Sequence, residues 1–463
     1  MTSRQHAQTH GDRGRETASE PAAKEARLRG ARQARGTTEC FVFVYLPGAT
    51  SPVVCGRFAQ SVTTDGQRVG RYTYGTSYLK HAGRVALDPG GLPVRQGTFP
   101  PVTAMGGVYG VLRDAGPDAW GRVVIERARG ARSPLPEIDY LLASGNDRIG
   151  ALAFGTLPDA PIPARGHHKA VELKALLEAA ALVEQEVEGT PAVQQAAELL
   201  LYGVTMGGAR PKAVIEEDGT AWIAKFPARA DRYNMAAVEA GLLRLAADCG
   251  MTVPNVRTER VGGKPVLLVQ RFDRRRIGSE VTRARYLSAL TILDADETPS
   301  PAWSYVALAE QLRRRSAKPD ADRSELFRRM VFNALVSNND DHPRNHAMLC
   351  WREEQWLLSP LFDVVPAGNP ASFERDLALA LTVGKYGRSA RRANLVSEAE
   401  VFGLGTSEAE AIITQLKAKV LEGWEERLRG FGATASDLDA VRHAIVPAAF
   451  EEPPPGMRPG SPR

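Results

Sequence analysis

A short polar run, Asn338 to Asn345, concentrates residue types that can do chemistry. It reads Asn-Asn-Asp-Asp-His-Pro-Arg-Asn and so places two acids, an imidazole and three amides within eight residues. Pro343 disfavours helix at the residue before it, so we expect the run to form a fixed turn with its side chains presented outward. Asp340 and Asn345 stand five residues apart, and Asp363 follows further on. Carboxylate and amide oxygens of this kind suit magnesium.

Protein-kinase-like phosphotransferases use this layout. In them the first Asp takes or orients the proton of the acceptor hydroxyl, the Asn five residues on holds magnesium, and an Asp after a hairpin holds magnesium at the phosphates. Two other interpretations stay open. The octapeptide could simply cap a helix and form a turn. Alternatively, His342 and His346 could chelate zinc, although Pro343 between them argues against the helix that such a pair needs.

The elements around this run are expected to bring its acids together. Apolar residues between Leu326 and Leu335 recur at the spacing of one helix face, which predicts an amphipathic helix just before the run. Residues His346 to Trp351 and Trp356 to Leu358 read as two strands around a turn. This hairpin would return Asp363 to the neighbourhood of Asp340.

Upstream, a glycine-containing loop carries residue types suited to a phosphate. Gly207 and Gly208 lie between a predicted helix and a β-like run, where backbone amides can approach a phosphate closely. Arg210 or Lys212 can supply charge. The loop does not match GxxxxGK[ST], so an ordinary P-loop NTPase is not supported. A Gly-Gly turn without a ligand remains the alternative.

A lysine follows on a short apolar strand, Trp222 to Pro227. Lys225 on a buried strand face needs an anion, and in kinase-like folds that anion is a nucleotide phosphate. An acid on the next helix often positions such a lysine, and Glu239 is the candidate here, with a solvated helix acid as the alternative. The apolar strand of Pro265 to Asp273 is then expected to be the hinge that contacts adenine.

Composition limits the protein class. The chain has 463 residues, 43% of them hydrophobic, which is ample for two or three globular domains. Residues 1–36 hold eight Lys or Arg against four Asp or Glu, so most of the net charge of +5 is a basic tail. Four scattered cysteines without CxxC spacing indicate reduced thiols. No run of eighteen apolar residues or signal-peptide pattern occurs, so we expect a cytoplasmic protein and no membrane contact.

These patterns predict an α+β protein with a two-lobed, protein-kinase-like fold. A glycine-dense, β-rich region with one or two helices comes first, and Trp120 among its turn residues is expected to pin a loop onto a core. The predicted parts are a disordered basic tail (1–37), a β-rich N-terminal subdomain (38–160), a kinase-like N-lobe with phosphate loop and hinge (161–275), a helical C-lobe (276–450) and a disordered Pro-rich tail (451–463).

Taken together, the motifs occur in kinase order, and at this point the sequence resembles a known family. It is similar to the HipA-like serine/threonine kinases, toxins of type II toxin-antitoxin systems, over roughly residues 38–448. The resemblance includes the stretch Asp118 to Arg122. The other motifs that carry it are Met206-Gly-Gly-Ala-Arg-Pro-Lys212, Ile223-Ala-Lys225-Phe-Pro, Leu268-Val-Gln-Arg-Phe-Asp273, Asn339-Asp-Asp-His-Pro-Arg-Asn345 and Leu358-Ser-Pro-Leu-Phe-Asp363.

The resemblance implies ATP- and Mg2+-dependent phosphorylation of a protein Ser or Thr. It also implies a HipB-like DNA-binding antitoxin as partner, with DNA reached only through it, and an aminoacyl-tRNA synthetase as the best-known kind of target. Carried over by position, the implied roles are catalytic base for Asp340, magnesium ligands for Asn345 and Asp363, autophosphorylation site for Thr205, and nucleotide binding for Gly207, Gly208, Ala209, Arg210, Lys212, Lys225, Gln270, Phe272 and His342.

Two residues depart from the family pattern. Gln270 stands where Glu is frequent at the hinge; it keeps an acceptor for the adenine amino group but lacks the charge. Thr205 stands where the family has its self-phosphorylated Ser, and it still offers a hydroxyl. Two other functions stay open beside a protein kinase: a small-molecule phosphotransferase on the same fold, and a co-repressor that keeps the fold without useful catalysis.

Overall fold

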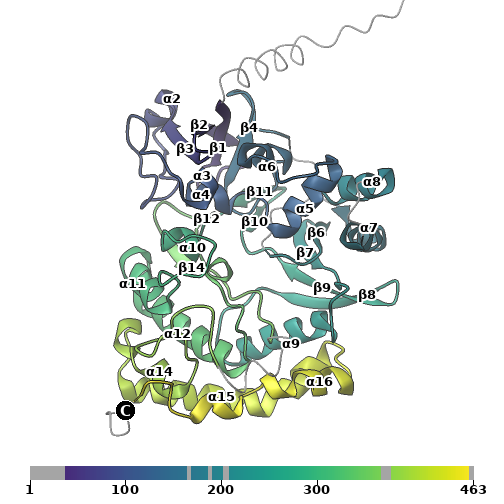
Figure 1. Ribbon diagram of the computed structural model, residues 1–463, viewed down its shortest axis with the longest axis vertical. Helices are drawn as coiled ribbons and strands as arrows, with labels where there is room; N and C mark the ends of the chain where they lie inside the picture. Colours follow the sequence, from purple (N-terminus) through teal and green to yellow (C-terminus); the bar gives the residue numbers. More distant parts are fainter. Residues whose placement is uncertain (1–36, 164–167, 186–189, 202–207, 367–376, 458–463) are drawn as a thin grey trace, which may run out of the picture.

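The computed structural model describes residues 37–163, 168–185, 190–201, 208–366 and 377–457. Along its longest axis the molecule runs from a strand-rich N-terminal part, through a second sheet, to a helical C-terminal part (Figure 1). This mixture of helix and sheet confirms the predicted α+β class. Across these ranges, no helix is long and apolar enough to cross a membrane.

The N-terminal part is built on an antiparallel sheet in the order β3-β2-β1-β4. Large side chains of its strands, among them Phe43, Phe58 and Tyr72, are buried in one core. Within residues 37–163 the structure has five helices where the sequence predicted one or two. Four of them are only four to seven residues long, too short to leave a helical period in the sequence. The elements are β1 (Thr37–Tyr45), β2 (Pro52–Val62), β3 (Arg68–Tyr74), β4 (Leu152–Gly155), α2 (Thr76–Leu79), α3 (Ala104–Gly107), α4 (Gly110–Asp114), α5 (Ala119–Ala128) and α6 (Glu137–Ala143).

The middle part carries a second sheet whose described strands follow the order β5-β6-β7-β9-β8. Strand β5 runs parallel to β6, and the other neighbours are antiparallel. Helices α7 and α8 pack against each other, and α8 also packs against α5 of the N-terminal part. Their apolar faces share one core with β6. The elements are β5 (His168–Lys169), β6 (Lys212–Glu217), β7 (Thr220–Lys225), β8 (Val256–Val261), β9 (Lys264–Gln270), α7 (Leu173–Gln185) and α8 (Pro191–Leu200).

Helix α9 (Met235–Asp248) joins the middle sheet to the C-terminal part. It contacts β8 and β9 on one side and the long helix α15 (Thr406–Gly430) on the other. Gly241 lies at the crossing with α15, where an added Cβ would come within 2.8 Å of the Leu428 Cα. The absence of a side chain at Gly241 therefore permits this close approach of the two helices.

The C-terminal part places the polar run between a helix and a hairpin. Helix α12 confirms the predicted amphipathic helix, and its apolar residues from Leu326 to Leu335 are buried. Strands β13 and β14 confirm the predicted hairpin, and β13 also pairs with β12. The elements are β10 (Arg274–Ile277), β11 (Glu280–Arg283), β12 (Arg285–Ser288), β13 (Ala347–Cys350), β14 (Trp356–Leu358), α10 (Ala289–Ile292), α11 (Tyr305–Arg315), α12 (Pro319–Leu335), α14 (Arg392–Val396) and α16 (Ala435–Val441).

Trp120 does not pin a loop, as the sequence predicted, but lies in the first turn of α5. Asp118 caps this helix by accepting a hydrogen bond from the Gly121 backbone N–H at 2.6 Å. The indole is buried in the core of the middle part, and its Nε1 donates to the Lys212 carbonyl at 3.1 Å. The turn-like sequence before it is therefore the cap of a helix.

The chain packs on the C-terminal helices beyond the boundary expected for a disordered tail. Glu451 forms ion pairs with Arg392 of α14 at 2.8 Å and Lys417 of α15 at 2.6 Å. Pro454 is buried, and the Pro453 carbonyl accepts a hydrogen bond from Arg391 at 2.5 Å. Residues 451–457 therefore belong to the packed C-terminal part.

We predict that Gly241→Ala destabilises the protein by about 1–3 kcal/mol, because the new methyl group overlaps the α15 backbone and forces the helices apart. Gly430→Ala is the matched control, since it adds the same group at the end of α15 with nothing within 4 Å. Urea unfolding of both variants measures the difference. Equal stability of the two variants would show that the crossing of α9 and α15 accommodates the added methyl group.

Candidate active site

A cleft lies where the three parts of the molecule meet. The middle part contributes Gly208 and Lys225, and the C-terminal part contributes Asn345 and Asp363. The N-terminal part contributes residues between Asp114 and Asp118. The structure therefore brings together residues that lie more than 200 positions apart in the chain.

Lys225 holds two carboxylates at the centre of this cleft. Its Nζ lies 2.6 Å from a Glu239 oxygen on α9 and 2.7 Å from an Asp363 oxygen after β14. The lysine and Glu239 are largely buried, whereas Asp363 is about one third exposed. The contact with Glu239 is the ion pair that the sequence predicted for Lys225. Lys225 thereby links the middle sheet, α9 and the C-terminal part.

The opposite charges of Lys225 and its two carboxylates work against the effect of burial on their pKa values. Burial alone would raise the pKa of Asp363, but the ion pair with Lys225 outweighs it and lowers that pKa to about 2. Burial lowers the pKa of Lys225, and the two carboxylates more than reverse this effect. Burial raises the pKa of Glu239, and Lys225 opposes that shift. At neutral pH, Asp363 is a carboxylate able to bind a cation.

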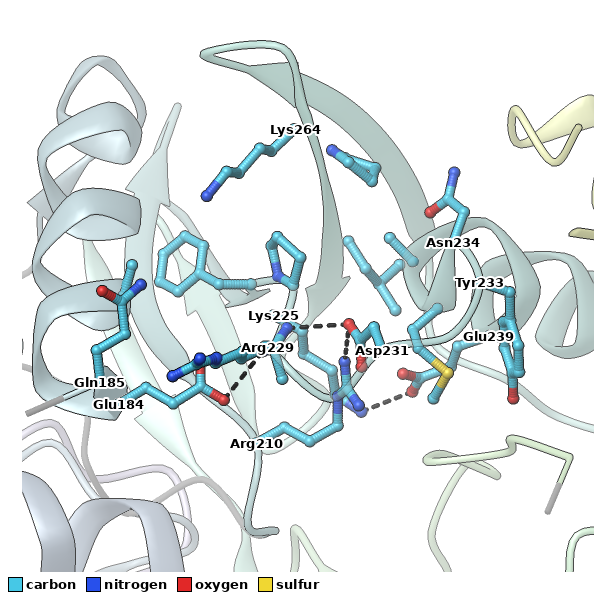
Figure 2. Close-up of a pocket in the computed structure, with 18 residues that line it drawn as sticks. Glu184, Gln185, Arg210, Lys225, Arg229, Asp231, Tyr233, Asn234, Glu239 and Lys264 are labelled. Atoms are coloured by element: carbon cyan, nitrogen blue, oxygen red, sulfur yellow. Dashed lines mark hydrogen bonds and ion pairs between the residues drawn. The ribbon is translucent and has the colours of Figure 1, made fainter. Parts of the chain in front are cut away.

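A second pocket, of about 450 Å³, opens beside the same ion pair (Figure 2). Lys225 and Glu239 line both pockets. Arg210, predicted to bind a phosphate, faces this second pocket and pairs with Asp231 at 2.6 Å. Its charge is therefore engaged away from the cleft.

The two adjacent acids of the polar run have different environments. Asp341 is buried, accepts a hydrogen bond from the Tyr305 hydroxyl and lies 2.8 Å from His346 Nε2. Asp340 is exposed as a residue, although its carboxyl group is partly shielded from water. This shielding raises the pKa of Asp340, His342 opposes the shift, and the negative charge of Asp363 adds to it. Asp341 is thus a structural residue, and Asp340 is the acid free to meet a substrate.

Asn345 and Asp363 supply oxygen atoms to one cleft. Asn345 ends the short helix η2 (Pro343–Asn345), and its Nδ2 donates to the Asp340 carbonyl at 3.2 Å. This bond leaves the carboxamide oxygen available. An amide oxygen and a carboxylate are the hard ligands that Mg2+ prefers, so the donor set fits this ion.

The zinc alternative finds no support in the geometry. His346 is buried against Asp341, and η2 rather than an α-helix separates it from His342. The described ranges contain no group of three or more His, Cys, Asp or Glu arranged to hold a metal. His342 itself is half-buried, with its ring 6.4 Å from that of Trp303, and does not line the cleft.

The end of the glycine loop is tied to the N-terminal part. The Lys212 Nζ donates to Asp118 at 2.7 Å and to the Gly208 carbonyl at 2.9 Å, and the lysine side chain is buried. Lys212 therefore holds the loop in place from behind, whereas Gly208, with a φ of +99°, lines the cleft. Ala209 is exposed and lies outside the lining. Gly207 and Thr205 fall outside the described residues.

The hinge residues separate into one that faces the cleft and one that does not. Phe272 lines the cleft, with its ring 5.4 Å from that of Phe362. Gln270 is absent from the cleft lining, and its carboxamide oxygen accepts from Asn255 at 2.6 Å. The structure thus brings Phe272, but not Gln270, to the position expected for a nucleotide contact.

Two acids that the sequence reasoning did not single out also line the cleft. Asp118 contacts the middle part by accepting a hydrogen bond from the Lys212 ammonium group. Asp114 reaches the C-terminal part, where it accepts from the Ser288 hydroxyl at 2.6 Å and the Thr291 hydroxyl at 2.8 Å. The segment between Asp114 and Asp118 is hereafter called the brace. In the sequence, the brace can be recognised by one acid before and one acid after a Gly-Pro pair.

Charged side chains extend the brace to the polar run of Asn338 to Asn345. Arg113 pairs with Glu297 at 2.8 Å, and Glu297 also pairs with Arg344 of η2. Arg122 pairs with Glu137 at 2.6 Å, and Glu137 lies 4.0 Å from Arg113. This ladder of five residues connects α5 and α6 to the residue next to Asn345.

Comparison with known proteins identifies the family. Residues 54–155 match the HipA N-terminal domain, and residues 204–424 match the HipA-like C-terminal domain. Together the matches span more than two thirds of the chain. The chain belongs to the HipA-like family.

Individual relatives agree with this assignment. A protein of Sinorhizobium fredii named "Putative kinase Y4mE" is 29% identical over 168 residues, which are 35% of this chain and 38% of that protein's length. In the structure of the Shewanella oneidensis MR-1 HipA, HipB and operator DNA complex, a chain with 17% identity matches with a TM-score of 0.60. The match covers 88% of this chain and 94% of that one. It shows that the HipA-like fold extends over most of the molecule.

We predict that Asp118→Asn destabilises the HipA-like protein by about 3 kcal/mol, because it removes the carboxylate that pairs with the buried Lys212 ammonium group at 2.7 Å. Asparagine is chosen because it can still cap α5. Adding Lys212→Met to this variant should restore much of the loss, since the buried positive charge is then removed as well. Thermal unfolding of the two single variants and the double variant measures the coupling. Additive effects would contradict it.

Proposed function

We propose that this HipA-like protein is an ATP- and magnesium-dependent protein kinase that phosphorylates serine or threonine. The main support is the position of Lys225, whose Nζ lies between Glu239 and Asp363 at 2.6 and 2.7 Å. A lysine held by a helix acid, beside an Asp that follows the catalytic hairpin, is the arrangement that positions nucleotide phosphates in kinases.

In this proposal, phosphoryl transfer is divided between residues that line the cleft and Asp340, which lies outside the lining and whose backbone carbonyl accepts a hydrogen bond from Asn345 of the cleft. Lys225 supplies positive charge beside the phosphates, and Phe272 offers an apolar contact for the base. Asn345 and Asp363 hold magnesium, which when bound neutralises charge on the transferred group. Asp340 accepts the proton as the acceptor hydroxyl bonds to the γ-phosphorus and the bond to ADP breaks.

The partners we propose follow from the family. The structurally similar HipA was solved with HipB and operator DNA. We therefore propose a HipB-like DNA-binding antitoxin as partner, with DNA reached through it. An aminoacyl-tRNA synthetase is the kind of protein acceptor to examine first, because the resemblance implies it.

The proposal predicts that Asp340→Ala reduces phosphate transfer from ATP at least about 100-fold without unfolding the protein, because Asp340 is an exposed base. Asn339→Ala, next to it in the loop, is the control that should keep activity. The measurement is labelling of cell-lysate proteins by the purified protein with labelled ATP and Mg2+, and EDTA should abolish it. Asp341→Asn should instead lower stability, because that side chain is buried among its partners.

Other outcomes of this assay would redirect the proposal. A labelled metabolite without any labelled protein would favour a small-molecule phosphotransferase. ATP binding without any transfer would favour a co-repressor. Labelling that persists in Asp340→Ala would overturn the role given to that residue.

We also propose Thr205 as a site of autophosphorylation, on the strength of the family resemblance alone. Mass spectrometry of the protein after incubation with ATP and Mg2+ is expected to find phosphate on Thr205, and Asp340→Ala should prevent it. An unmodified Thr205 in protein that labels other substrates would refute this site.

A further inference from the structure

A separate pocket of about 190 Å³ lies outside the active-site cleft and is lined by four arginines. It is bordered by the end of β1, the β6–β7 turn, the residues after β9 and the hairpin β10–β11, which lies between the two larger sheets in Figure 1. The arginines are Arg271, Arg274, Arg276 and Arg283. Whether the pocket attracts an anion depends on how many of these four positive charges are already neutralised by acids.

Two of the four arginines are neutralised by buried acids. Arg271 lies 2.6 Å from Asp147 and 3.0 Å from Asp273. Arg274 lies 2.9 Å from Asp147 and 2.7 Å from Asp273. The remaining acid of the lining, Glu216, pairs with Lys169 at 3.2 Å. These contacts leave the charges of the other two arginines in excess.

Among the residues that the structure describes, the groups in contact with the Arg283 guanidinium are neutral. Its guanidinium lies 3.8 Å from the centre of the Tyr45 ring, and its Nη1 donates to the Asn146 carbonyl at 2.7 Å. Burial, together with the positive charge of Arg274, lowers the pKa of Arg283 to about 9. Burying the Arg283 charge close to Arg274 costs free energy, and an anion bound beside Arg283 would reduce that cost.

Arg276 is also held by neutral groups, at a position shaped to receive it. Its Nε donates to the Gly278 carbonyl at 2.8 Å, and its Nη1 donates to the Asp218 carbonyl at 3.3 Å. Gly219 has a φ of +72°, and a Cβ there would come within 1.5 Å of that Nη1. The β6–β7 turn thus makes room for the guanidinium.

The register of the hairpin places these charges on one face. Arg274 pairs with Arg283 across the strands, and Arg276 lies two residues along from Arg274. Residues two apart in a strand point to the same side, and like charges directly opposite each other destabilise a sheet. Arg275 points to the other side, where it lies 3.9 Å from the centre of the Trp351 ring.

We propose that this pocket binds a phosphate group of a small molecule, with Arg276 and Arg283 as the side chains that hold it. Planar guanidinium groups match phosphate oxygens and form strong charge-assisted hydrogen bonds with them. Thr50 and Thr220 line the same pocket, and their side chains are further potential hydrogen-bond donors. Arg271 lines both this pocket and the cleft, so a bound phosphate would lie one side chain from the active site. The inference does not depend on the proposed kinase activity.

Thermal unfolding of the full-length protein, titrated with inorganic phosphate at constant ionic strength against chloride, tests the proposal. Phosphate should raise the melting temperature saturably, and Arg283→Gln or Arg276→Gln should weaken its binding about tenfold or more. Arg275→Gln is the matched control, since it removes the same charge from the opposite face of the hairpin. The response should persist in Lys225→Met, which separates this pocket from the cleft.

A second arm of the titration compares ribose 5-phosphate with ribose. Tighter binding of the sugar phosphate than of inorganic phosphate identifies an organic phosphate as the ligand, and equal binding identifies the free anion; both support the site. No effect beyond that of chloride, or an equal effect in Arg276→Gln and Arg283→Gln, would overturn the proposal. Because Arg276 is exposed, Arg276→Gln should fold and keeps the test decisive even if Arg283→Gln does not.

Discussion

The architecture of the cleft depends on one buried positive charge. An ammonium group in the interior is tolerated only when carboxylates surround it, and removing one partner of such a group costs about 3–5 kcal/mol. Lys225 meets this requirement with acids from two different segments, Glu239 on α9 and Asp363 after β14. Because the three side chains must converge, the middle sheet, α9 and the β13–β14 hairpin are fixed relative to one another.

The brace gives the N-terminal part a comparable role. Asp118 and Asp114 are four residues apart, yet one contacts the middle part and the other contacts the C-terminal part. Short segments with buried carboxylates at both ends resist changes in the spacing of the bodies they join, since each acid would have to leave its hydrogen-bond donors. The N-terminal part is therefore a structural component of the active site rather than an appended domain.

Sequence reasoning succeeded where the signal was local. The period of α12, the alternation of the β13–β14 hairpin and the lone lysine on β7 each follow from residues close together in the chain, and the structure has all three. It could not show partners that are remote in the chain or that depend on how strands pair. Lys212 looks like a phosphate ligand in its own loop, but its anion is Asp118, 94 residues earlier. Gln270 looked like a hinge contact, and its partner Asn255 is set by the arrangement of the strands.

The backbone of Asp363 adopts a left-handed conformation, with a φ of +61°. Most side chains pay about 1–2 kcal/mol for this geometry, whereas Asn, Asp and Gly adopt it readily. Asn or Gly would therefore suit the backbone at this position, but either would remove one of the two carboxylates that hold Lys225. Of the residue types that this backbone favours, aspartate alone also supplies the negative charge that Lys225 needs, so backbone geometry and charge together restrict what can stand at this position.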